Sequence, residues 1–94
     1  RHIQFPPGRV RRDLEEVLAW LREHGRDRDP VVRHRLAELA VRVLEVEMHG
    51  LRVLDSMLKG RPAAVEAAAN KVVHTLLCQE IARTAVEFGG EAAR

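Results

Sequence analysis

The chain has 94 residues, a formal net charge of +2 at pH 7 and one cysteine. This length suffices for one domain, although a chain of this size buries only about 60–65% of its unfolded surface. The small net charge and the lack of a continuous basic stripe argue against nucleic-acid binding, and the apolar runs are too short to span a membrane. A single thiol, Cys78, cannot form an internal disulfide, which predicts a reducing, cytoplasmic location.

Aromatic residues are few, so a core must consist of Leu, Val and Ala, and residues that favour helices dominate the composition. At the start, Pro6-Pro7-Gly8 predicts a linker or extended arm over residues 1–8. Because the sequence begins at Arg1 without a methionine, we expect a piece of a longer protein, with a helical bundle domain over residues 9–94.

A first helix is expected from about Arg9 to His24, closed by Gly25. Its apolar positions recur at helical spacing: Val10, Leu14, Val17, Leu18 and Leu21. The basic residues Arg9, Arg11 and Arg12 are expected to pair with Glu15 and Glu16 within a turn. A charged, solvated turn over residues 26–29 follows.

A second helix is expected from Pro30 to Lys59, with Asp29 as its N-cap, and a rod of this length measures roughly 45 Å. We expect one buried face, made of Val32, Leu36, Leu39, Val43, Val46, Leu54, Met57 and Leu58. A solvated face is expected opposite, made of Glu38, Arg42, Glu45, His49, Arg52 and Ser56. Gly50 lies within the apolar stripe, where it is expected to let another helix approach closely.

Gly60 ends this helix, and a third helix is expected from Pro62 to Phe88. It is apolar on two faces. One face carries Val65, Ala68, Val72, Leu76 and Val86, and the other carries Ala67, Leu77, Cys78, Ile81, Ala85 and Phe88. Two other helices cover one face well and the second only poorly, so we expect a further partner, either a fourth helix beyond Arg94 or another subunit. The predicted fold is an all-α up-down bundle, with three long helices that form part of a four-helix bundle.

Few residues suggest chemistry. Glu45 and His49 lie four apart, as metal ligands on a helix can, but a site needs three or four ligands, so no metal is expected. Cys78 with His74 has the same spacing without an orienting acid, which favours a buried structural thiol over a nucleophile. Glu47 falls inside the apolar stripe and must find a partner or raise its pKa. We expect a structural ion pair or interface contact, with Lys71 as an available cation.

The order of these elements resembles the C-terminal helical domain of the acyl-CoA dehydrogenase family, in particular its divergent bacterial branch, over about Arg9 to Gly90. The resemblance rests on six segments: residues 22–25 (Arg-Glu-His-Gly), Asp29-Pro30-Val31-Val32-Arg33, Gly50-Leu51-Arg52, Lys59-Gly60-Arg61-Pro62, Ala69-Asn70-Lys71-Val72-Val73 and Gly89-Gly90. It implies part of an FAD flavoenzyme of fatty-acid metabolism that oxidises the α–β bond of an acyl-CoA thioester. It also implies a homo- or hetero-oligomer assembled through the bundle.

In this family a Gly-Gly turn lies near the neighbouring subunit's FAD, so the resemblance implies that Gly89 and Gly90 contact the cofactor. The sequence departs from the family elsewhere. The Arg-x-Gln-Phe-Gly cofactor motif should fall near residues 24–28, which read His-Gly-Arg-Asp-Arg. The family's catalytic Glu positions lie before Arg9 or beyond Arg94, so the catalytic residue is unknown and this fragment alone is not catalytic. A degenerate subunit paired with an active one also fits.

Two other interpretations remain open at this point. A non-catalytic helical interaction or scaffold module fits the apolar faces, and it would be colourless and indifferent to acyl-CoA. A metal-binding bundle would carry stoichiometric iron or zinc.

Overall fold

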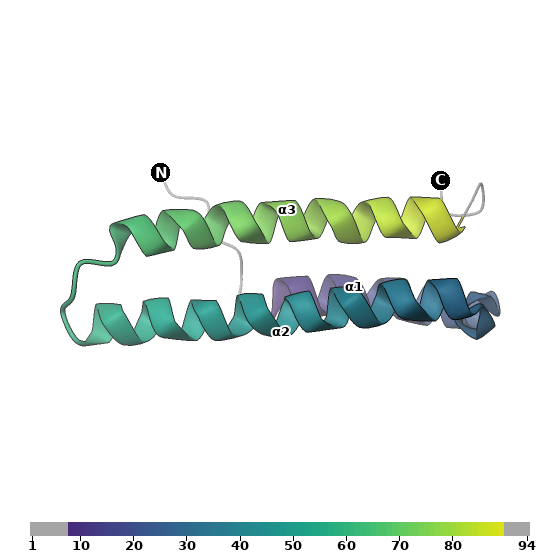
Figure 1. Ribbon diagram of the computed structural model, residues 1–94, viewed down its shortest axis with the longest axis horizontal. Coiled ribbons are helices and arrows are strands. Elements are labelled where there is room, and N and C mark those ends of the chain that lie inside the picture. The colour runs from purple at the N-terminus through teal and green to yellow at the C-terminus, as the bar shows by residue number, and fades with distance from the viewer. Residues whose placement is uncertain (1–7, 90–94) are drawn as a thin grey trace.

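The part of the chain that the structure describes, residues 8–89, forms three α-helices in an up-down arrangement (Figure 1). In this computed structural model α1 spans Arg9–Glu23, α2 spans Pro30–Leu58 and α3 spans Ala64–Gly89, with a 3₁₀ turn, η1, at Arg26–Arg28. Helices α2 and α3 run antiparallel along the molecule, whose principal extents are 48 × 26 × 16 Å. The described residues contain no strand, so the predicted all-α bundle is confirmed.

Local sequence sets the corner between α1 and α2. Gly25 has a φ of +71°, a left-handed conformation that costs residues with a Cβ atom, so glycine closes α1 as predicted. The Asp29 side chain accepts a hydrogen bond from the Val31 amide at 2.9 Å, and Pro30 is the first residue of α2. The predicted N-cap and first-turn proline are therefore confirmed.

The corner between α2 and α3 has the geometry of a Schellman motif. Gly60 has a φ of +73°. Its amide donates to the Met57 carbonyl at 3.0 Å, and the Arg61 amide donates to the Ser56 carbonyl at 2.9 Å. These bonds satisfy carbonyls that a helix end otherwise leaves open. Helix α3 begins two residues later than predicted, at Ala64.

The core lies where all three helices meet. Two groups of buried side chains form it: Val10, Leu39, Val43, Val46, Leu77 and Ile81 in one, and Leu21, Val32 and Leu36 in the other. Leu14 and Val17 of α1 pack against both groups and join them. The core is aliphatic, as the composition predicts.

The buried face of α2 ends earlier than predicted. Helix α1 has 15 residues and α2 has 29, so α1 covers only one half of the α2–α3 pair (Figure 1). Leu54, Met57 and Leu58 lie beyond the reach of α1 and are exposed, so their predicted burial is wrong. Val53 is buried in this half of α2.

Gly50 does not mark a tight helix crossing. A Cβ atom built on Gly50 would meet only the Asn70 side-chain nitrogen at 3.9 Å, which is ordinary van der Waals contact. The expectation that a missing side chain lets another helix approach closely is therefore wrong. What lies opposite Gly50 is a polar side chain of α3 rather than its backbone.

One of the two apolar faces of α3 is buried within the chain, and the other is exposed. Leu77 and Ile81 are buried within the chain, against α1 and α2. On the other face Val65 is 80% exposed, and Val72, Leu76 and Val86 are exposed as well. The chain covers one face of α3 and leaves the second uncovered, as the spacing predicts.

Candidate functional site

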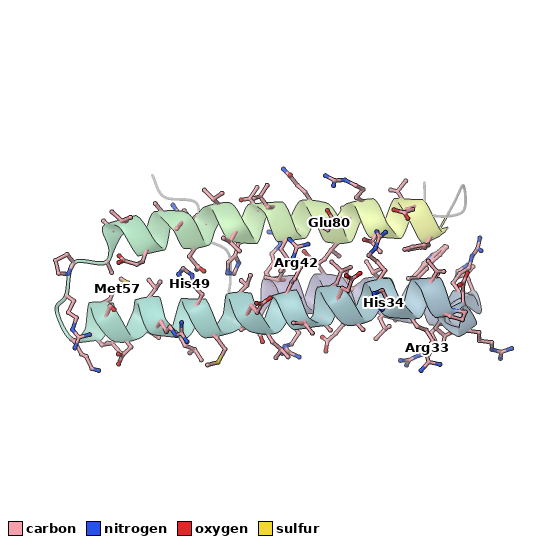
Figure 2. The ribbon with its side chains drawn as sticks, in the orientation of Figure 1. Arg33, His34, Arg42, His49, Met57 and Glu80 are labelled. Atoms are coloured by element: carbon pink, nitrogen blue, oxygen red, sulfur yellow. The ribbon has the colours of Figure 1, made fainter. Side chains whose placement is uncertain are left out.

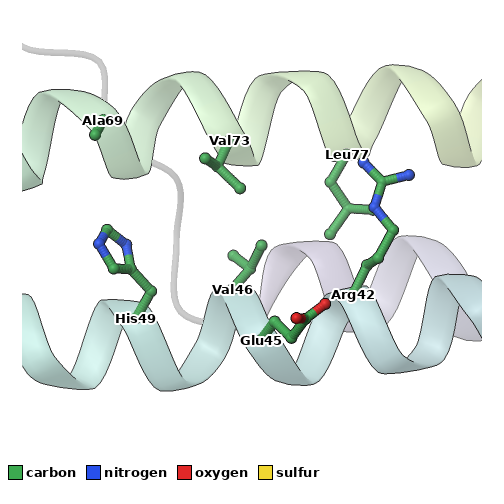
Figure 3. A pocket seen from close by; sticks show the side chains of 7 residues that line it. All are labelled: Arg42, Glu45, Val46, His49, Ala69, Val73 and Leu77. Carbon is green, nitrogen blue, oxygen red and sulfur yellow. The ribbon is translucent and has the colours of Figure 1, made fainter.

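A groove of about 320 Å³ lies between α2 and α3 (Figure 3). Seven residues line it: Arg42, Glu45, Val46 and His49 from α2, and Ala69, Val73 and Leu77 from α3. Val46 and Leu77 are buried, whereas Arg42 and Glu45 are exposed. The groove therefore combines an apolar floor with a charged margin, the pattern of a small-ligand or side-chain site.

The α2 side of this groove corrects one prediction. Arg42, Glu45 and His49 were expected on a solvated face. Arg42 and Glu45 are exposed as expected, but the His49 side chain projects from α2 toward α3 (Figure 2). His49 is half-buried, and its Nδ1 lies 2.9 Å from Oδ1 of Asn70. When Nδ1 carries the proton and donates to Asn70, Nε2 is left as an acceptor. The sequence analysis missed Asn70, which shares the covered face of α3 with Leu77.

His74 and Cys78 follow on α3. Burial, and secondarily the nearby His49, lower the pKa of His74. Burial also raises the pKa of the Cys78 thiol, and the neighbouring Asp13 adds to this effect while Arg9 opposes it. The Cys78 Sγ lies 3.8 Å from Oδ2 of Asp13. A half-buried thiol with a raised pKa is a poor nucleophile, which agrees with the predicted structural role.

Glu47 is held by an ion pair, as predicted, but the partner differs. Arg11 of α1 donates from Nε to Oε2 at 2.8 Å and from Nη2 to Oε1 at 2.6 Å. The hydrogen bonds from Arg11 lower the pKa of the Glu47 carboxyl against the opposing effect of burial. The suggested partner Lys71 is exposed on α3, and Arg11 pairs with Glu47 rather than with Glu15 or Glu16.

The end of α3 carries the residues that the family resemblance singles out. Gly89 is buried and is the last residue of the helix, while Gly90 lies outside the described residues. Just before it, the Phe88 ring lies under the Arg35 guanidinium, 5.3 Å from the ring centroid. Arg35 also forms an ion pair with Glu87 at 3.3 Å, so Arg35 connects α2 to this end of α3.

Within residues 8–89, no group of three or more His, Cys, Asp or Glu side chains is placed to hold a metal ion. Glu45 and His49 line the same groove without a third ligand of this kind. No helix in this stretch is both long and apolar enough to cross a membrane.

A protein-family model described as acyl-CoA dehydrogenase, C-terminal domain, matches residues 3–93. The chain belongs to this family. Separate comparisons with curated proteins and with solved structures found no match. The acyl-CoA dehydrogenase C-terminal domain is thus the assignment that the helix order and segment spacing predicted.

Within this family domain, the residues singled out from sequence divide into two places. The groove between α2 and α3 brings together Glu45 and His49, and Gly89 lies at the far end of α3. Sequence reasoning missed Arg11 and Asn70 as partners of Glu47 and His49. Asn70 gave a signal, because it lies on the same face of α3 as the buried Leu77, whereas the exposed Arg11 gave none.

Proposed function

We propose that the chain is the C-terminal helical domain of an FAD-dependent acyl-CoA dehydrogenase, where it supplies oligomer contacts and one wall of the flavin and acyl-CoA pocket. The observation that carries this proposal is the family match over residues 3–93. The uncovered apolar face of α3 supports it, because a helix with such a face packs against another part of the protein or another subunit.

The described residues fit one side of a cofactor pocket rather than a closed cofactor site. The groove between α2 and α3 is open, and its charged residues Arg42 and Glu45 are exposed. Gly89 and Gly90 are the proposed cofactor contacts, since a glycine backbone lets a flat ring system approach closely. Bound FAD supplies the hydride acceptor for α,β-dehydrogenation of an acyl-CoA thioester. The catalytic base is proposed to come from outside residues 9–94.

Flavin content tests this proposal. The protein is purified natively, with its partner subunit if it has one, and the flavin released on denaturation is counted per chain. We expect stoichiometric FAD and expect Gly90→Val to lower it. Ala19→Val is the matched control, because Ala19 is exposed on α1 and lies outside the uncovered apolar face of α3. Absence of FAD from the wild-type protein, or equal loss in both folded variants, would contradict the proposal.

A second function is a non-catalytic helical interaction module. It is favoured by the exposed apolar side chains on both long helices, among them Val41 and Leu51 on α2 and Val72 and Leu76 on α3. A folded, colourless protein that binds neither FAD nor acyl-CoA would favour this function over the first.

A further inference from the structure

One side chain of α2 contacts two successive residues at the end of α3. Helix α3 ends at the same end of the molecule at which α2 begins (Figure 1). There the Arg35 side chain donates a hydrogen bond from Nη1 to Oε1 of Glu87 at 3.3 Å. Its guanidinium carbon also lies 5.3 Å from the centroid of the Phe88 ring. Both contacts are made immediately before Gly89, the last residue of α3.

The position of Gly89 depends on its neighbours. Gly89 is buried, but a glycine has no side chain that could pack or form a hydrogen bond. Adjacent residues of a helix are separated by 100° around its axis, so a group that contacts both Glu87 and Phe88 restricts how the last turn is rotated. The Phe88 ring also packs against buried residues of α1 and α2, but hydrophobic contact is non-directional. The directional contact therefore comes from Arg35.

Charge gives Arg35 a second effect on the last turn of α3. This turn contains the acidic Glu87 and no basic residue. Because the C-terminal end of a helix carries partial negative charge, a carboxylate is unfavourable there and a cation is favourable. Arg35 supplies this cation from α2. Arg83, by contrast, forms its ion pair within α3, with Glu80 at 2.9 Å.

We infer that Arg35 is a positioning residue for the proposed flavin contact, because it holds the last turn of α3 so that the Gly89 backbone faces the cofactor. This inference rests on the proposed function, and Arg35 acts through Glu87 and Phe88 rather than by contact with FAD. A rotation of the last turn by about 25° moves a Cα atom by about 1 Å, since the Cα atoms lie about 2.3 Å from the helix axis. A shift of this size exceeds the tolerance of about 0.5 Å for a preorganised binding contact.

Loss of the Arg35 contacts is expected to loosen the end of α3 without unfolding the protein. The side chains of Arg35 and Glu87 are 33% and 48% exposed, and ion pairs of this kind contribute little to global stability. Hydrogen exchange of the flavin-free protein measures the local effect. In Arg35→Met, we expect amides of the last turn of α3 to exchange several-fold faster, and expect amides around the buried Val43 to exchange as in the wild type.

The test is titration of FAD into the flavin-stripped full protein, with its partner subunit if it has one. Arg35→Met removes the charge, keeps an apolar side chain and is expected to raise the Kd for FAD about tenfold. Arg35→Lys keeps the charge but loses the planar group, so we expect about threefold. Arg83→Met is the matched control, because it makes the same substitution near the same end of α3, and its Kd is expected to stay within about twofold of the wild type.

Two measurements separate positioning from other roles. The visible circular dichroism of the flavin at saturating FAD is expected to change in Arg35→Met, which a mere loss of stability would not cause. Glu87→Gln removes the ion pair from the α3 side, so it is expected to weaken FAD binding about threefold. If Arg35 bound FAD itself, Glu87→Gln would free the guanidinium and tighten binding.

Tighter binding by Glu87→Gln, or hydrogen exchange in the last turn of α3 that Arg35→Met leaves unchanged, would overturn the inference. If Arg35→Met does not fold, Arg35→Lys and Glu87→Gln decide in its place. A wild-type protein that binds FAD, with equal Kd values for Arg35→Met and Arg83→Met, overturns the inference and leaves the proposed function standing. A wild-type protein that binds no FAD contradicts the proposed function and the inference with it.

Discussion

Arg11 of α1 and Glu47 of α2 are joined by two parallel hydrogen bonds of 2.8 and 2.6 Å across 36 residues of chain. A planar guanidinium that meets both carboxylate oxygens fixes direction as well as distance. The pair therefore sets how α1 is rotated on α2. Both side chains are partly exposed, so the contribution to stability is small and the geometric role is the larger one.

The pair predicts a pH dependence of stability. Because the hydrogen bonds from Arg11 lower the pKa of Glu47 in the folded state, its contribution is full above the unfolded pKa of about 4.3. It is lost as the pH falls through the folded pKa. We expect Glu47→Gln to lower the urea midpoint slightly at pH 7, and expect this difference from the wild type to shrink toward about pH 3. A difference that stays constant with pH would show that the Glu47 charge contributes nothing to stability.

Two neighbouring leucines on α3 provide a matched test of which face is buried. Leu77 is 0% exposed and Leu76 is 54% exposed. We expect Leu77→Ala to lower the free energy of unfolding by about 2–5 kcal/mol, because it leaves a cavity in the core. Leu76→Ala is expected to change it by only about 0.5 kcal/mol. Urea denaturation at a low protein concentration measures both, and equal effects would mean that the assignment of the two faces is wrong.

Two glycines are expected to respond to alanine in opposite directions. Gly50→Ala should stabilise the protein by about 0.5–1 kcal/mol, because its helical backbone accepts a Cβ atom and the nearest atom lies 3.9 Å away. Gly60→Ala should destabilise it by about 1–2 kcal/mol, because φ is +73° there. Thermal unfolding measures both changes. Destabilisation by Gly50→Ala would mean that another helix lies close to Gly50, which the structure does not show.

We expect the Cys78 thiol to react slowly with alkylating reagents. Burial raises its pKa, so the thiolate fraction at pH 7 is smaller than that of an ordinary cysteine. We expect iodoacetamide to alkylate the folded chain more slowly than the urea-unfolded chain, and expect the rate to reach half its maximum at a higher pH. Rates measured from pH 6 to about pH 10 cover the transition. Fast alkylation of the folded protein at neutral pH would instead indicate an activated nucleophile.

The sequence predicted the fold wherever the cause is local. Gly25, Asp29 and Gly60 set the helix ends through backbone conformation and capping, and all three act as predicted. The prediction from sequence was wrong where burial depends on residues that are distant in the chain. Leu54 is exposed because α1 is too short to cover it. The helical periodicity of α2 alone carries no information about the length of α1.

For the candidate site too, the predictions were right where the cause is local and wrong where the cause lies in a distant part of the chain. The two apolar faces of α3 were predicted, because face assignment needs only the spacing of residues such as Leu76 and Leu77. The partners of Glu47 and His49 were not predicted, since they depend on how α1 and α3 are rotated about their own axes. A rotation of one residue position, 100° on a helix, exchanges Lys71 for Asn70 as the side chain presented to α2.

The visible absorption spectrum of the natively purified protein during addition of acyl-CoA tests the account most directly. If the chain serves as the helical domain of an acyl-CoA dehydrogenase, a flavin spectrum is present and bleaches as the acyl-CoA thioester is oxidised. A folded protein with no flavin absorption, or with a flavin spectrum that every acyl-CoA leaves unchanged, would contradict it.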